Sequence, residues 1–407
     1  MSEVEDVVDD LSDAWAFDEA VSGNVRNPYP EFERFRAEEP VQRIDVSVMP
    51  GEEGKPLFVV YRFEEAQQLL RDNETFSSSI ILSAYGEALG KRVMLGMDEP
   101  EHGRHRALVA KAFSQKGLAR FQDELVARVA NDLIDKMAPN GKANLVKEFT
   151  FPYPTRVIAG LLGLPEEDFL RFQKWSLGLL SYALNPERGL EASKALVEYY
   201  RPILHARREN PRDDLISRLA VAEIDGERLE DEEIFSFLRL LLPAGVETTY
   251  RSLGNLLFAL LSNEDQLDAI REDRDLIPQA IEEGVRWDAP LLSIIRVAMR
   301  DTELGGVHIP EGSSVMPMLG SANHQGERFD DPDKFDVFRP AKSNLGWGNG
   351  THVCLGMHLA RLEIRTAINL LLDRLPNLRL DPEADDPHIR GQVFRSPTAL
   401  PVLFDKA

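Results

Sequence analysis

The chain has 407 residues, of which 43% are hydrophobic and 29% are charged, so it contains enough apolar sequence for a large buried core. Its 69 acidic residues outnumber its 47 lysines and arginines, which gives a formal net charge of -22. This charge argues against sequence-independent binding to nucleic-acid phosphates and to anionic membrane surfaces. The single cysteine excludes an internal disulfide and the paired-cysteine zinc motifs.

The beginning of the chain, residues 1–24 approximately, is acidic, and its first basic residue is Arg26. A signal peptide would open with positive charge. The most apolar stretch, 237–261, is interrupted by Arg239, Glu247 and Arg251, which a bilayer span would tolerate poorly. No repeat or linker divides the sequence. We therefore expect one domain over residues 1–407, in a monomer located in the cytoplasm.

The predicted elements are mostly helices. A short strand at 56–61 precedes an amphipathic helix at 63–72. Further helices are predicted at 115–137, 165–184, 190–207, 232–261 and 355–372. Strands at 307–309 and 314–318 are predicted to pair as a hairpin across a Pro-Glu-Gly turn, and a final strand pair is predicted near Val393 and at 400–404. The fold class is mainly α with a minor β part (α+β).

A basic segment follows the first helix. His102 and Arg106 are four residues apart, so they face the same way on a helix. Residues 103–120 contain no acidic residue although acids outnumber bases overall. The remaining basic residues of this segment form a candidate docking patch for an acidic partner: Arg104, Lys111, Lys116 and Arg120. An ordinary solvated basic face is the alternative.

An acid beside a threonine lies within the predicted helix 232–261, which is about 45 Å long. The segment 243–248 reads Pro-Ala-Gly-Val-Glu-Thr, and proline and glycine weaken the helical hydrogen bonds there. A buried Glu247 is costly unless it is paired or used. Glu247 therefore either serves chemistry together with Thr248 or reaches a polar patch or a buried arginine.

Two further groups of charged residues carry a weaker signal. Glu283 and Arg286 lie on one face of a predicted helix, and Arg339 follows them before the cysteine segment. Arg296 follows an apolar run at 291–295. Taken alone, each of these residues fits an ordinary surface charge.

The strongest local signal surrounds the only cysteine. Residues 345–356 read Leu-Gly-Trp-Gly-Asn-Gly-Thr-His-Val-Cys-Leu-Gly, and an apolar helical run follows. A thiolate at a helix N-terminus is stabilised by the helix dipole, and glycines let the backbone approach a flat cofactor. A small buried hydrophobe is the alternative for Cys354. A phosphate-binding loop is excluded, because no apolar strand precedes the glycines and their spacing differs from the dinucleotide fingerprint.

At these residues the chain resembles the cytochrome P-450 family. The family's cysteine motif, Phe-Gly-x-Gly-x-His-x-Cys-x-Gly, matches residues 347–356 except that Trp347 stands where phenylalanine is usual. Asn344 replaces a basic residue often found upstream. The family's oxygen-activation motif, Ala-Gly-x-(Asp/Glu)-Thr, matches 244–248 in full. Five of the family's motifs occur in the family's order, at residues 102–106, 244–248, 283–286, 335–340 and 347–356. The resemblance extends over nearly the whole chain.

The resemblance implies a single-domain P-450 fold with haem b between the long central helix and the cysteine-loop helix. It implies that Cys354 ligates the iron, that Thr248 positions dioxygen and that Glu247 relays protons. The residues implied to contact haem are Ala244, Gly245, Gly348 and Gly356, together with the propionate ligands His102, Arg106, Arg296 and His352. Glu283, Arg286 and Arg339 are implied to form a structural triad.

The implied function is insertion of one oxygen atom from O2 into an apolar small molecule, by hydroxylation or epoxidation. A ferredoxin and its NAD(P)H-dependent reductase would supply electrons. A lipophilic substrate such as a terpenoid, steroid, fatty acid or aromatic is implied by apolar residues in the family's pocket-lining segments. They are Ile80, Ile81, Leu82, Leu241, Leu292, Ile294, Ile295, Val393 and Phe394. The alternatives are a peroxide-driven or isomerising haem enzyme and a haem sensor or carrier without turnover.

Overall fold

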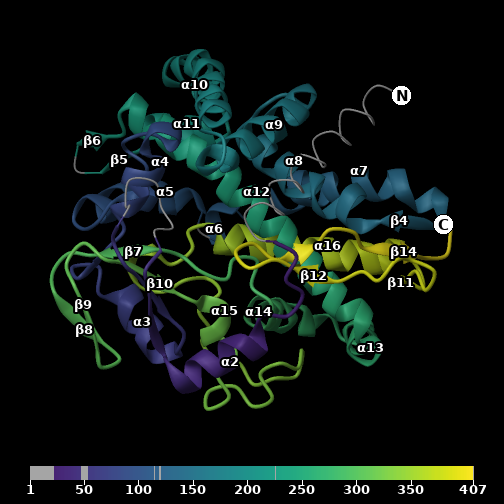
Figure 1. The fold of residues 1–407 in the computed structure, drawn as a ribbon. Helices are drawn as coiled ribbons and strands as arrows, with labels where there is room; N and C mark the ends of the chain where they lie inside the picture. The colour runs from purple at the N-terminus through teal and green to yellow at the C-terminus, as the bar shows by residue number, and fades with distance from the viewer. Residues whose placement is uncertain (1–22, 47–53, 114, 119–120, 225, 407) are drawn as a thin grey trace.

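A computed structural model describes residues 23–46, 54–113, 115–118, 121–224 and 226–406. The acidic segment predicted at the start of the chain thus lies almost wholly outside the described residues. A long helix, α12 (Asp231–Ser262), runs through the centre of the molecule (Figure 1). A capping box starts it, in which Glu230 accepts from the backbone of Glu233 and the side chain of Glu233 accepts in return.

Other helices pack around α12. Its neighbours are α8 (Pro152–Leu161), α9 (Phe169–Leu180), α10 (Pro186–Glu209), α13 (Glu264–Glu272), α14 (Ile277–Trp287) and α16 (Met357–Arg374). The more peripheral helices are α2 (Tyr29–Glu38), α3 (Phe63–Arg71), α4 (Ile80–Leu89), α5 (Glu101–Phe113), α6 (Gln115–Leu118), α7 (Arg128–Met137), α11 (Leu215–Val221) and α15 (Leu319–Ala322). No helix in these described ranges is long and apolar enough to cross a membrane.

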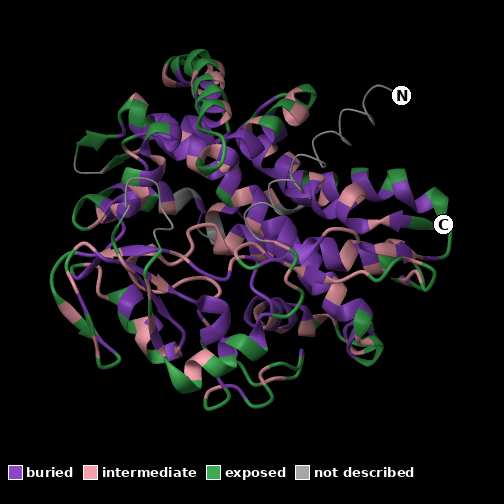
Figure 2. Cartoon of the chain, in the orientation of Figure 1, coloured by how far each residue is buried: buried purple, intermediate pink, exposed green. Residues whose placement is uncertain are grey.

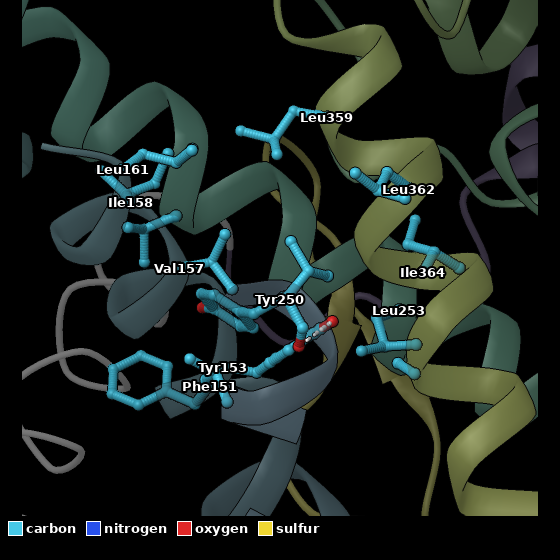
Figure 3. Close-up of a cluster of buried hydrophobic side chains, with 14 of the residues drawn as sticks. Phe151, Tyr153, Val157, Ile158, Leu161, Tyr250, Leu253, Leu359, Leu362 and Ile364 are labelled. Carbon is cyan, nitrogen blue, oxygen red and sulfur yellow. Dashed lines mark hydrogen bonds between the residues drawn. The ribbon is translucent and has the colours of Figure 1, made fainter. Parts of the chain in front are cut away.

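The main hydrophobic core lies where α8, α12 and α16 meet. Figure 3 shows Tyr153 and Val157 of α8 close to Tyr250 and Leu253 of α12, with Leu362 of α16 on the far side. All five side chains are buried. Buried residues fill the middle of the molecule, whereas the outer end of α10 is largely exposed (Figure 2). The core therefore fixes how the central helix crosses the helix that follows the cysteine.

The largest sheet lies on the other side of the molecule, beside α3 (Figure 1). Its strand order is β1-β2-β10-β7-β3. The strands are β1 (Val41–Ile44), β2 (Leu57–Val60), β3 (Phe76–Ser77), β7 (Arg296–Ala298) and β10 (Ser314–Pro317). β10 is parallel to β2, with Val315 opposite Phe58, and antiparallel to β7.

The remaining strands form small sheets. They are β4 (Lys142–Asn144), β5 (Glu223–Ile224), β6 (Glu227–Arg228), β8 (Thr302–Leu304), β9 (Val307–Ile309), β11 (Arg379–Leu380), β12 (Ile389–Arg390), β13 (Ser396–Pro397) and β14 (Pro401–Leu403). The mainly α fold with a minor β part that the sequence predicts is confirmed.

The predicted hairpin between 307–309 and 314–318 is wrong. β9 pairs instead with β8, through a two-residue turn at Gly305 and Gly306 whose φ angles are +57° and +80°. Two consecutive residues with positive φ favour this tight turn. β10 is left to occupy the middle of the main sheet.

Two other predictions also need correction. The strand 400–404 does not pair near Val393, because β14 pairs with β11 and β4, while β12 pairs with β13. The predicted helix 115–137 is not one regular α-helix. A π-helical turn at Gln122–Ala127 precedes α7. Pairing partners far apart in sequence and a change of helical pitch leave little local signal.

Candidate functional site

Cys354 lies at the end of a tight loop just before α16. The backbone N–H of Cys354 donates to the carbonyl of Trp347 at 2.8 Å, and that of Gly348 donates to Leu345 at 2.9 Å. Gly348 and Gly350 have φ angles of +74° and +71°. A Cβ on Gly350 would lie 2.1 Å from a backbone oxygen of Leu70, so this position requires glycine.

The surroundings of the Cys354 thiol act on its charge in opposite directions. Burial raises the pKa of the thiol, whereas hydrogen bonds from the backbone N–H groups of Gly356 and Met357 lower it, as does the charge of Arg106. These donors are the ones that a thiolate bound to a metal would use. A Cβ on Gly356 would meet no described atom within 4 Å, so the position two residues after the cysteine borders open space.

The middle of α12 has an accessible face although most of the helix is buried. Ala244 is exposed and Gly245 and Thr248 are partly exposed, while Leu242 and Val246 are buried. Every residue from 346 to 358 is likewise partly exposed. Both the motif on α12 and the cysteine loop therefore have accessible residues, which a flat cofactor bound between them would require.

Two histidines meet beside the cysteine loop. The rings of His102, on α5, and His352 lie with centroids 4.0 Å apart. Nε2 of His352 lies 3.1 Å from the Ser78 hydroxyl and 3.0 Å from the Met97 carbonyl oxygen. Burial lowers the pKa of His352 to about 3, with the charge of Arg296 adding to the effect.

One ring nitrogen of His102 makes no hydrogen bond to the described residues. Nε2 of His102 is buried and has no hydrogen-bond partner among the described residues, while Nδ1 lies 3.0 Å from Glu99. An orphaned polar atom of this kind is costly unless a ligand satisfies it. A haem propionate fits this position.

Two arginines add positive charge to the same region. Arg106 donates from Nη2 to the carbonyl of Val353 at 2.6 Å. Arg296, on β7, is 5% exposed, and burial lowers the pKa of its guanidinium to about 10. Among the residues that the structure describes, its guanidinium donates only to the carbonyl of its own neighbour, Ile295, at 2.8 Å. An anionic cofactor group would supply the partner that a buried guanidinium needs.

The acid and the alcohol of α12 both have partners. The Thr248 hydroxyl donates to the carbonyl of Ala244 at 2.8 Å. Glu247 is 3% exposed and accepts from Nη2 of Arg251 at 3.0 Å. The alternative that Glu247 reaches a buried arginine is therefore realised in the structure, next to the threonine of the motif.

The structure brings together the three residues expected to form a triad. Arg286 donates to both carboxylate oxygens of Glu283, at 2.7 and 2.8 Å, and Arg339 donates to the same carboxylate at 3.1 Å. Arg286 also binds the carbonyl oxygens of Asn323 and Pro332. The cluster thus links α14 to the segment that leads into the cysteine loop.

The expected pocket residues do not all face open space. Ile80 and Leu292 are buried, and Leu292 packs against Met318 in a separate core cluster. Leu241 and Ile295 are 8% and 7% exposed. The partly exposed members are Ile81, Leu82, Ile294, Val393 and Phe394.

The expected docking patch is only partly described. Arg104 ion-pairs with Glu227 and, at 3.4 Å, with the buried Glu233, so its charge is already compensated. The side chains of Lys111, Lys116 and Arg120 lie outside what the structure describes. The patch therefore remains a prediction.

Sequence reasoning did not assign roles to three residues near the site. Arg251 holds Glu247, and its signal was the i,i+4 spacing on one helix. Asp98 accepts from the backbone N–H of Ser78 at 2.9 Å, beside Arg296. Glu282 binds Nε1 of Trp347 at 3.1 Å and Nε of Arg361 at 2.7 Å. No local sequence pattern predicts the contacts of Asp98 and Glu282.

The sequence profile of the cytochrome P450 family matches residues 179–400. Cytochrome P450 107B1 of Saccharopolyspora erythraea is 37% identical over 409 residues, covering 97% of this chain and 98% of that protein. The cytochrome P450 monooxygenase PikC of Streptomyces venezuelae is 35% identical over 362 residues, which cover 87% of this chain and 85% of that protein. The solved structure of Bacillus subtilis PksS, a polyketide synthase cytochrome P450, has a TM-score of 0.86 at 32% identity and covers 93% of this chain and 97% of that one.

Fold, cysteine loop and relatives together define a haem-thiolate oxidoreductase. The chain belongs to the cytochrome P450 family, and it is a monooxygenase of the type found in bacteria.

Proposed function

We propose that the protein hydroxylates or epoxidises a lipophilic small molecule, with haem b held by Cys354. The observation that carries the proposal is the cysteine loop, where two backbone N–H groups point at the Cys354 sulfur. The unused Nε2 of His102 and the buried guanidinium of Arg296 offer partners for the propionates. The bound haem would supply the activation of O2.

The residues of α12 would control protons at this site. The Thr248 hydroxyl, now donating to the Ala244 carbonyl, lies on the accessible face of the helix and can turn toward a reactant. Glu247 lies one residue earlier and would bring protons from the protein interior. Proton delivery by positioned groups of this kind contributes about 10²–10⁴-fold to a rate.

The substrate would be apolar. Ile81, Leu82, Ile294 and Phe394 offer partly exposed apolar surface on segments expected to line the pocket. A mostly apolar lining binds mostly apolar ligands. The solved neighbour PksS is named for a polyketide synthase. We therefore include lipophilic polyketides, with terpenoids, steroids, fatty acids and aromatics, among the candidate substrates to be screened.

We further propose that a ferredoxin supplies electrons to a monomer in the cytoplasm. The segment 103–120 remains the candidate docking site because it lacks acidic residues in an acidic chain. Lys116 and Arg120 are better probes than Arg104, whose reversal would set a like charge beside Glu233. Lys116→Glu with Arg120→Glu should slow the first electron transfer most at low salt.

The proposed function is tested by coupling measurements on Thr248→Ala. The haem-loaded protein is first screened for compounds that shift the iron from low to high spin. With such a compound, the variant should still consume NADH and O2 but should release peroxide instead of product. Unchanged product per NADH would overturn the role of Thr248, and no substrate-stimulated NADH consumption in the parent would favour a sensor or carrier.

A further inference from the structure

Arg251 connects the acid of the α12 motif to another part of the fold. It is 1% exposed, and its Nη2 donates to Glu247 Oε2 at 3.0 Å. Its other terminal nitrogen, Nη1, donates to the Ser396 hydroxyl at 3.2 Å. One guanidinium therefore bridges the carboxylate of α12 and strand β13, which packs against that helix.

The same guanidinium touches the segment expected to line the pocket. Its central carbon lies 5.0 Å from the ring centroid of Phe394 and 4.8 Å from that of Tyr250. Phe394 is partly exposed and forms an antiparallel β-bridge with Leu291. The carbonyl of the preceding residue, Val393, accepts a hydrogen bond from the backbone N–H of Leu292 at 2.9 Å. A molecule that presses on Phe394 would therefore also press on the groups that hold Arg251.

The ion pair favours one state of the carboxylate. An opposite charge within about 4–6 Å stabilises the ionised form over the protonated one, and more so away from water. A group that relays protons has to accept and release a proton during the reaction. While Arg251 holds Glu247, proton transfer through Glu247 is hindered, and loosening Arg251 removes the hindrance.

We propose that Arg251 is a positioning residue that links occupancy of the pocket to proton relay by Glu247. In the empty pocket, Arg251 keeps Glu247 paired and suppresses wasteful O2 reduction. A substrate that contacts Phe394 displaces the segment 393–396 and its hydroxyl at Ser396, and Arg251 then releases the carboxylate. This inference rests on the proposed function, because it assumes that Glu247 relays protons.

The test uses the full-length, haem-loaded protein without substrate, with a ferredoxin and its reductase. NADH consumption should increase in the order parent, Ser396→Ala, Arg251→Gln, because the first variant removes one anchor of Arg251 and the second removes the pair. Positioned proton delivery contributes about 10²–10⁴-fold to the step that it assists. Because other steps also limit NADH consumption, Arg251→Gln should raise the overall rate by less, roughly 3-fold or more. Arg251→Lys, which keeps the charge, should restore most of the suppression.

A double variant and a matched control separate this role from loosened packing. Adding Glu247→Gln to Arg251→Gln should abolish the increase, because the carboxylate that carries it is gone. Arg207→Gln breaks another buried pair, in which Arg207 donates to Asp214 at 2.6 Å, and should leave NADH consumption unchanged. An increase that persists in the double variant, or an equal increase in Arg207→Gln, would overturn the inference.

Infrared spectroscopy gives a second readout that does not depend on turnover. The substrate-free protein with Arg251→Gln should show a protonated-carboxyl C=O band that the double variant lacks. If Glu247→Gln alone leaves NADH consumption in the presence of substrate unchanged, the relay itself is wrong and the proposed function must be revised. If that variant slows consumption while Arg251→Gln matches the parent and shows no new band, only the coupling through Arg251 is wrong.

Discussion

Arg106 and Val353 are joined by a 2.6 Å hydrogen bond from the guanidinium to the carbonyl just before the cysteine. Through this bond α5 supports the cysteine loop directly, in addition to presenting His102 to the same region. The basic residues of the site are thus part of the scaffold of the loop as well as candidate partners for an anionic cofactor.

The first prediction concerns Arg296. Arg296→Ala should weaken haem retention by about 3–5 kcal/mol, the range found when one member of a buried charge pair is removed. Arg106→Ala should cost less, because Arg106 is only half-buried. Haem release into apomyoglobin measures the effect. Arg128→Ala, on a surface ion pair with Glu166, serves as the control. Equal haem release from the control and Arg296→Ala would contradict the assignment.

The second prediction concerns the triad. Arg339→Ala removes one charged partner of the buried Glu283 carboxylate, which keeps Arg286 and the backbone N–H of Asp336, and it removes the donor to the carbonyl of Asp331. The free energy of unfolding, measured in urea, should fall by roughly 3 kcal/mol. Arg271→Ala, which removes a surface pair with Asp268 and one backbone contact, should cost about 1 kcal/mol. A loss in Arg339→Ala no larger than this control would show that the triad does not stabilise the fold.

The third prediction concerns Trp347, the aromatic residue in the cysteine motif. Its indole donates to Glu282 at 3.1 Å, and the Arg361 guanidinium lies 5.2 Å from its ring centroid. Trp347→Phe should cost about 1 kcal/mol of unfolding free energy, because phenylalanine loses the hydrogen bond to Glu282 and keeps an aromatic face for Arg361. A double-mutant cycle with Glu282→Gln should give a coupling of about 0.5 kcal/mol or more. Strict additivity would mean that the two side chains act independently.

The fourth prediction uses a buried carboxyl group on α16. Glu363 is fully buried, neither of its oxygens has a hydrogen-bond partner among the described residues, and burial raises its pKa well above the usual range. Because the pKa of Glu363 is higher in the folded protein than in the unfolded chain, folding takes up a proton at pH values between the two pKa values. Stability is therefore present at acidic pH and is lost as pH rises toward the folded pKa, by up to about 1.4 kcal/mol per pH unit.

Glu363→Gln should remove this dependence, because an amide does not titrate. Urea unfolding at pH 5, 6 and 7 should show the variant gaining on the parent as pH rises, whereas Glu124→Gln, at an exposed acid, should follow the parent. A constant difference between Glu363→Gln and the parent over this range would mean that Glu363 is ionised in the folded protein.

The helices and the cysteine loop could be predicted because their signals are local. Apolar spacing predicts the central helix 232–261, one residue inside α12 at each end, and the glycines at 346–350 predict the tight loop. Strand pairing could not be predicted in the same way. β10 joins β2 across more than 250 residues. The predicted turn after Pro310 does form, but β9 pairs with β8 through the Gly305-Gly306 turn and not with β10.

Partners of charged residues were predictable where a motif or the spacing along one helix fixes them. Glu283, Arg286 and Arg339 meet as the resemblance implied. The pairing of Arg104 with Glu227 joins α5 to a short hairpin more than 100 residues away, and nothing in either segment specifies it. Long-range contacts between flexible side chains depend on the assembled fold.

The ferrous–CO absorption spectrum of the haem-loaded protein tests the central claim most directly. If Cys354 supplies the thiolate, the parent should show the red-shifted Soret band of a thiolate-ligated haem, and Cys354→His should bind haem yet lose that band. A parent spectrum like that of a histidine-ligated globin, unchanged in Cys354→His, would contradict the account.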